Sequence, residues 1–167
     1  MPNQLETFEH NIPPLWNPTS RILILGSFPS QISREHAFYY ANPQNRFWRV
    51  MAAVIGCAVP EGTEEKKHML LRARIALWDV VKTCSIRGSS DASIREYEAN
   101  PLWLFIEQTQ IRHIFANGAA AYRLYQACAQ NMTGLKAVRL PSTSPANASF
   151  SLQRLIDLWS REIRPYL

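Results

Sequence analysis

Short apolar runs alternate with amphipathic stretches along the chain, and this alternation predicts strands alternating with helices. Four apolar runs have the length of buried strands, at residues 21–25, 75–81, 111–116 and 135–140. Apolar residues at intervals of three and four predict helices at residues 46–55, 63–74, 102–108, 119–129 and 152–163. For the helix at 102–108 we expect Asn100 as its cap and Pro101 as its first residue.

This order of elements favours an α/β fold with a four-stranded parallel sheet covered by helices on both faces, a three-layer α/β/α arrangement. The 167 residues predict one domain, residues 1–167, with a core at about 20–165. Ligands of such sheets bind beyond the carboxyl ends of the strands. The segments that follow the four predicted strands are therefore the candidates for function: 26–45, 82–100, 117–118 and 141–149.

The first of these segments joins a glycine to a group of aromatic side chains. It contains Gly26-Ser-Phe-Pro-Ser30 and then Phe38-Tyr-Tyr-Ala-Asn-Pro-Gln-Asn-Arg-Phe-Trp48. A glycine after a strand permits a ligand to approach the backbone, and aromatic rings beside it can stack on a planar base. The alternatives are that the rings form a small satellite core and that Asn45 only caps the next helix.

The last segment, Leu140-Pro-Ser-Thr-Ser-Pro-Ala-Asn-Ala-Ser149, places three hydroxyl residues between two prolines just before a helix. Such hydroxyls can donate hydrogen bonds to phosphate oxygens, although an ordinary Ser/Pro turn has the same composition. Asn117-Gly118 is by itself only a good turn. Asp79 lies in the second predicted strand, where a buried carboxylate needs a partner, and the sequence leaves its role open.

Composition narrows the class of protein. Eighteen Lys and Arg against 13 Asp and Glu give a net charge of +5, which is compatible with an anionic partner. The longest apolar run, residues 50–60, is about half of the roughly 20 residues that a membrane span needs, and no secretory signal is visible. The three cysteines and four histidines form no close ligand pair, so we expect no disulfide, metal cluster or cofactor and a reducing, cytoplasmic location.

Taken together, the motifs resemble the uracil-DNA glycosylase superfamily. Gly26-x-x-Pro29 followed by Asn42-Pro-x-Asn-Arg-Phe-Trp48 is similar to the first motif of the mismatch-specific branch. Phe115-Ala-Asn-Gly118 resembles the third strand end of that branch, and Leu140-Pro-Ser-Thr-Ser144 its second motif. With Ala76-Leu-Trp-Asp-Val-Val81 included, the set looks closest to the DNA-deoxyinosine (hypoxanthine-DNA) glycosylase branch.

The resemblance implies an enzyme that flips a deaminated base out of DNA and hydrolyses its N-glycosidic bond without a metal or cofactor, acting as a monomer. Mismatch-specific enzymes carry a water-activating Asn where this chain has Phe28. The hypoxanthine branch is similar in lacking it, and we expect Asn45, or secondarily Asn42, to position the water. The base-binding residues expected are Gly26, Ser27, Phe28, Phe38, Tyr40, which stacks on the base, and Asn117. The DNA-binding residues expected are Ser142, Thr143, Ser144, Pro145, Ala146 and Asn147.

Two other functions fit the same residues. One is a mismatch-specific uracil or thymine glycosylase. The other is a non-catalytic module that binds damaged DNA, since Phe28 replaces the usual catalytic residue. Comparing release of the different bases separates the enzymes, and tight, salt-sensitive binding without release indicates the module.

Overall fold

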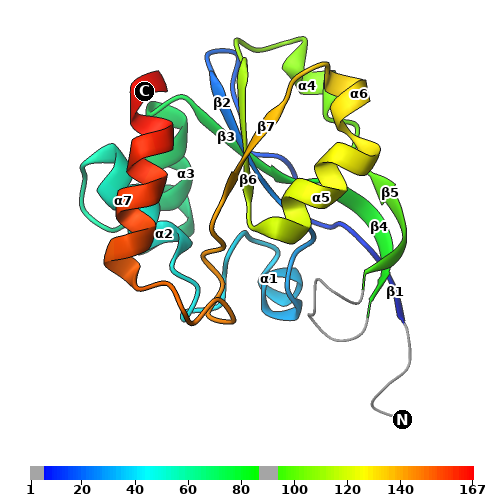
Figure 1. Ribbon diagram of the computed structural model, residues 1–167, viewed down its shortest axis with the longest axis horizontal. Helices are drawn as coiled ribbons and strands as arrows, with labels where there is room; N and C mark the ends of the chain where they lie inside the picture. The colour runs from blue at the N-terminus through cyan, green and yellow to red at the C-terminus, as the bar shows by residue number, and fades with distance from the viewer. Residues whose placement is uncertain (1–5, 87–93) are drawn as a thin grey trace.

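The computed structural model describes residues 6–86 and 94–167, and its centre is a parallel sheet of four strands (Figure 1). The strands are β2 (Ile22–Gly26), β3 (Ile75–Asp79), β6 (His113–Asn117) and β7 (Ala137–Leu140), in the order β3-β2-β6-β7. Every position of β2 and β3 is buried, as in a sheet covered on both faces. The predicted four-stranded parallel sheet is confirmed.

Helices cover both faces of this sheet. Figure 1 shows α2, α3 and α7 on one side and α5 (Ala119–Cys128) on the other, where α5 contacts β6 and β7. The bounds on the first side are Phe47–Ile55 for α2, Thr63–Arg72 for α3 and Leu152–Ile163 for α7, and α7 packs against α2 through its apolar side. The shorter helices are α4 (Trp103–Ile106), α6 (Gln130–Thr133) and the 3₁₀ helix η2 (Arg164–Tyr166). In the described part of the chain no helix has the length and apolarity to span a membrane.

A second, antiparallel sheet was not expected. It consists of β1 (Glu6–Glu9), β4 (Val81–Ile86) and β5 (Arg95–Ala99), in the order β1-β4-β5. Charged, mostly exposed side chains in β1 and β5 hide these strands from a search for apolar runs. The predicted strand 75–81 in fact ends at Asp79, and the segment 82–100 is largely strand; its residues 87–93 lie outside the described residues.

The long segment after β2 contains a short helix, α1 (Gln31–His36), that was also not expected. Ser30 caps it, since its hydroxyl accepts a hydrogen bond from the backbone N–H of Ser33 at 3.2 Å. Six residues are too few to give a readable helical period.

Asn100 does not cap a helix, so that prediction is wrong. The helix α4 begins at Trp103, and the Asn100 side chain is buried with 2% of the residue exposed. Its amide donates to the carbonyl oxygens of Asp79 at 2.9 Å and Val81 at 3.1 Å. Asn100 therefore ties the end of β3 to the start of β4.

We expect Asn100→Ala to lower the free energy of unfolding by about 2–3 kcal/mol, since it removes two hydrogen bonds from buried carbonyls. Urea denaturation measures the change. The exposed Asn131 in α6 is the matched control, and Asn131→Ala should stay within about 0.5 kcal/mol of the parent. Equal stability of the two variants would contradict the bridging role of Asn100.

Candidate functional site

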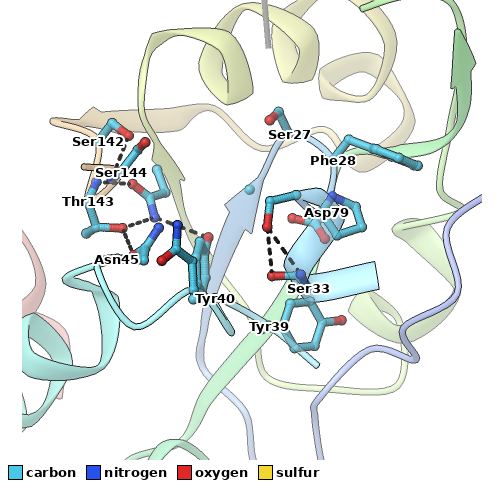
Figure 2. Close-up of a pocket in the computed structure, with 15 residues that line it drawn as sticks. Ser27, Phe28, Ser33, Tyr39, Tyr40, Asn45, Asp79, Ser142, Thr143 and Ser144 are labelled. Carbon is cyan, nitrogen blue, oxygen red and sulfur yellow. Dashed lines mark hydrogen bonds between the residues drawn. The ribbon is translucent and has the colours of Figure 1, made fainter. Parts of the chain in front are cut away.

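A pocket of about 120 Å³ lies at the carboxyl ends of the parallel strands (Figure 2). Each strand contributes to its wall: Gly26 ends β2, Asp79 ends β3, Asn117 ends β6, and Ser142 follows β7. The chain leaves β2 toward β3 on one side and later returns to β6 on the other, which opens a crevice between the strand ends. The pocket wall consists of Gly26, Ser27, Phe28, Pro29, Ser30, Ser33, Tyr39, Tyr40, Asn42, Asn45, Asp79, Asn117, Ser142, Thr143 and Ser144.

Only glycine fits at position 26, because two side chains of the pocket lie directly over it. A Cβ atom at this position would overlap the Asp79 carboxylate oxygen Oδ1 and lie 3.0 Å from the Tyr40 hydroxyl. The absent side chain of Gly26 thus leaves room for the Asp79 carboxylate and the Tyr40 hydroxyl above the end of β2.

Tyr40 is held in a strained backbone conformation on the pocket wall. Its φ of 49° lies in the left-handed region, which non-glycine residues adopt only when their surroundings compensate the cost. Its ring stacks on Phe47 with 4.1 Å between centroids, and its hydroxyl accepts a hydrogen bond from Asn117 at 3.1 Å. Phe38 does not line the pocket; it stacks on Trp48 at 5.7 Å, as the satellite-core alternative describes.

A chain of hydrogen bonds joins Asn117, Thr143 and Asn45 (Figure 2). The Asn117 amide donates to the Thr143 hydroxyl at 3.0 Å, and that hydroxyl donates to Asn45 Oδ1 at 2.9 Å. The Thr143 backbone N–H donates to Asn117 Oδ1 at 3.1 Å, and the residue has no exposed surface. Asn45 Oδ1 also accepts a hydrogen bond from the N–H of Phe47, the first residue of α2, at 2.9 Å, although Arg46 and not Asn45 occupies the N-cap position.

Arg46 fastens the segment after β7 to the start of α2. Its guanidinium donates to the carbonyl oxygens of Ser144 at 2.9 Å, Asn147 at 3.1 Å and Thr143 at 3.4 Å, and also to that of Phe150. The sequence alone identified Arg46 only as part of a motif. Its hydrogen-bond partners are carbonyls about 100 residues away in the chain, so no local sequence pattern indicates them.

The hydroxyls of Ser142 and Ser144 both accept backbone hydrogen bonds. Ser142 Oγ accepts from the Ser144 N–H at 3.1 Å, and Ser144 Oγ accepts from the Ala146 N–H at 3.2 Å. The side-chain amide of Asn147 donates to the Ser142 carbonyl at 3.0 Å. Pro145, Ala146 and Asn147 lie beyond the pocket wall, with Pro145 and Ala146 exposed at the tip of the segment.

Asp79 has a buried partner that the sequence did not reveal. Its Oδ2 lies 2.7 Å from His10 Nε2, and the two side chains are 6% and 2% exposed. Because the backbone N–H of Ile12 donates to His10 Nδ1 at 3.3 Å, the imidazole proton sits on Nε2 and is donated to Asp79. The pair joins residues 69 positions apart, so no sequence spacing indicates it.

Aromatic groups surround this pair. Phe28 lies edge-on to His10 at 6.0 Å between centroids. Burial raises the pKa of Tyr39, and the nearby Asp79 charge raises it further, so the phenol stays protonated and donates to the Pro13 carbonyl at 2.8 Å.

The pocket offers neutral hydrogen-bonding groups and one carboxylate. No Lys or Arg is among the residues described as lining it. Within residues 6–86 and 94–167, no three metal-ligating side chains lie together. The arrangement suits an uncharged planar ligand with a polar edge, bound between an aromatic ring and amide donors.

Comparisons with known proteins agree with this geometry. Residues 13–162 match the family model described as the uracil DNA glycosylase superfamily. The chain is 38% identical over 148 residues to the hypoxanthine DNA glycosylase of Methanosarcina acetivorans, covering 87% of this chain and 92% of that protein. It is 34% identical over 93 residues to the hypoxanthine DNA glycosylase of Methanosarcina barkeri, covering 55% and 59% of the two chains.

The fold agrees as well. The solution NMR structure of a Methanosarcina acetivorans protein that was proposed to be a uracil DNA glycosylase superposes with a TM-score of 0.81. The match has 34% sequence identity and covers 96% of this chain and 98% of that one. The chain therefore belongs to the uracil DNA glycosylase superfamily.

Proposed function

We propose that this protein is a DNA glycosylase that flips hypoxanthine of deoxyinosine out of DNA and hydrolyses its N-glycosidic bond in base excision repair. One observation carries the proposal: the pocket gathers Tyr40, Asn45, Asn117 and Asp79 at the strand ends, in a chain 38% identical to a hypoxanthine DNA glycosylase. The protein acts as a monomer, inside the cell where the DNA is, and needs no metal or cofactor.

Recognition of the base rests on what deamination changes. Deamination replaces an amino group by a carbonyl and places a hydrogen on the neighbouring ring nitrogen, so a deaminated base presents an N–H beside a C=O. Asp79 Oδ1, which reaches over Gly26, accepts that N–H. The backbone amides of Ser27 and Tyr40 donate to the carbonyl, and Phe28 completes this end of the wall. Adenine has a lone pair where hypoxanthine has the N–H, so the carboxylate repels it.

Tyr40 supplies the stacking surface. Phe47 already covers one face of the ring, so the other face is the one that a flipped base can use. Tyr40 already has its strained backbone conformation in the protein without DNA. Little conformational entropy is therefore lost at this position when the base binds.

Contacts to the DNA backbone come from the segment after β7. The hydroxyl oxygens of Ser142 and Ser144 accept from backbone N–H groups, which leaves their O–H hydrogens to donate to phosphate oxygens. Pro145, Ala146 and Asn147, at the tip of this segment, fill the space that the flipped nucleotide leaves in the stack. Thr143 is fully buried and takes a different role, argued below.

When the bond breaks, the sugar becomes an oxocarbenium ion and the base becomes an anion. Donors aimed at the base anion lower the barrier as an oxyanion hole does. Asn45 and Asn42 both line the pocket and are the side chains that we assign to this step and to holding the water.

We expect the wild-type protein to release hypoxanthine from a duplex with a single deoxyinosine faster than it releases uracil, or thymine opposite guanine. Single-turnover assays, with alkaline cleavage of the abasic strand, measure the three rates. Addition of EDTA should leave them unchanged. Faster uracil or thymine release would indicate the mismatch-specific activity, and tight, salt-sensitive binding without release would indicate a damage-binding module.

We expect Asp79→Asn to slow hypoxanthine release by about 10- to 100-fold, because the amide loses the carboxylate's charge and part of its acceptor capacity. The ratio of hypoxanthine to adenine release should fall as well, since the repulsion of adenine disappears. Single-turnover rates on deoxyinosine and deoxyadenosine duplexes measure both effects. The exposed Asp157 in α7 gives the control, and Asp157→Asn should change neither quantity. An unaltered ratio in Asp79→Asn would contradict the proposed reading of the base edge.

A further inference from the structure

The direction of each hydrogen bond around Thr143 can be deduced from two backbone groups. A backbone N–H only donates, so the Asn117 atom that faces the Thr143 N–H is the carbonyl oxygen. The other end of this amide is then the NH₂ group, which donates to the Thr143 hydroxyl and to the Tyr40 hydroxyl. The oxygen of the Thr143 hydroxyl is therefore an acceptor toward Asn117.

The same reasoning determines the orientation of the Asn45 side-chain amide. The Phe47 N–H faces its Oδ1, so this atom is the carbonyl oxygen. The Thr143 hydroxyl, which already accepts from Asn117, donates its hydrogen to the same oxygen. Both lone pairs of Asn45 Oδ1 are thus in use, and the group that Asn45 can still offer a ligand in the pocket is its amide NH₂.

From this network we infer that Asn45 acts as a hydrogen-bond donor to the departing base and that Thr143 is the positioning residue that holds it in this orientation. The inference rests on the proposed glycosylase function. The N-glycosidic bond breaks with its electron pair leaving on the base. Water supplies hydroxide to C1′ of the sugar, and its remaining proton ends on the released base. Asn45 transfers no proton; it stabilises the negative charge on the purine as the bond breaks.

Asn42 is the better residue to hold the water. In the described part of the chain its Oδ1 accepts one hydrogen bond, from the Gln44 N–H at 3.0 Å, which leaves acceptor capacity for a water O–H. A hydrogen-bond acceptor binds an O–H of the water and so turns a lone pair of the water oxygen toward the sugar. The amide NH₂ of Asn45 is a donor and would instead bind to a lone pair of the water. The structure therefore divides the two roles between the two asparagines.

Two substitutions at Asn45 separate a donor from a water-holding group. Asn45→Ala removes the donor, and we expect the single-turnover rate of hypoxanthine release to fall by about 100-fold or more. Asn45→Asp keeps both acceptor contacts to Phe47 and Thr143 but places negative charge beside the base anion, so its rate should be lower still. If Asn45 activated water, the carboxylate would be the stronger acceptor, and a faster rate for Asn45→Asp than for Asn45→Ala would overturn the inference.

Variants of Thr143 test the positioning role. Thr143→Val keeps the shape but removes the hydroxyl, and we expect a loss of about 10- to 100-fold in rate with unchanged affinity for deoxyinosine DNA. Thr143→Ser should recover most of the rate. In the Asn45→Ala background, Thr143→Val should cost less than about 2-fold, because Thr143 acts through Asn45. Thr109→Val, at the amino end of the sheet, is the control and should leave the rate unchanged.

The thermal midpoint of each variant separates lost folding from lost positioning. A folded Thr143→Val protein that keeps the wild-type rate would overturn the role of Thr143, as would equal losses in the presence and absence of Asn45. The wild-type protein in the same assay tests the proposed function separately. If it releases no hypoxanthine, the glycosylase proposal fails; if it does, the order of the Asn45 variants decides the donor role, and the Thr143 variants decide the positioning role.

Discussion

The site depends on the guanidinium of Arg46, which holds the segment after β7 against the start of α2. A planar guanidinium has five N–H donors, and here they serve four carbonyl oxygens of one irregular segment. The backbone N–H of Arg46 donates to the Thr143 carbonyl at 3.1 Å as well. These bonds hold the segment that carries Thr143 beside Asn45, where the Thr143 hydroxyl links Asn45 to Asn117. An uncharged side chain of similar length could not satisfy so many carbonyls at once.

Apart from the Asp79 carboxylate, the residues described as lining the pocket carry no formal charge. Arg46 and His10 lie outside the wall, where Arg46 donates to backbone carbonyls and His10 donates to Asp79, and the other groups on the wall are hydroxyls, amides and rings. A flipped nucleotide brings an uncharged base into the pocket while its phosphates stay outside, so donors without formal charge suit the interior. Under the proposed mechanism, such donors would stabilise an anion that forms only as the bond breaks without binding anions of the ground state, which is the condition for catalysis.

The sequence predicted the fold well wherever apolar burial determines structure. Strands β2 and β3 are buried at every position, and the helices α2, α5 and α7 have clear apolar sides, so a local pattern is enough to predict them. It failed for β1 and β5, whose exposed, charged residues pair through backbone hydrogen bonds that any side chain permits. Asn100 was misassigned for a related reason: a buried amide and a helix cap use the same residue type, and only the tertiary structure decides between them.

In the candidate site, too, the sequence predicted residues that lie in local motifs but not their partners from distant parts of the chain. The motifs led to Tyr40, Asn45 and Thr143 because they lie in segments that follow strands, but neither the hydrogen-bond directions nor the partner of Asp79 can be read from spacing. Phe28 illustrates why. As a substitute for a catalytic Asn it indicates a loss of activity, yet its ring lies edge-on to His10 and helps to exclude water from the His10–Asp79 pair. A hydrogen bond shielded from water is stronger and better oriented. The apolar residue in the first motif thus lies beside a buried carboxylate at the end of the neighbouring strand, and under the proposed function polar groups from β3 and from just before α2 take the place of the Asn that the motif lacks.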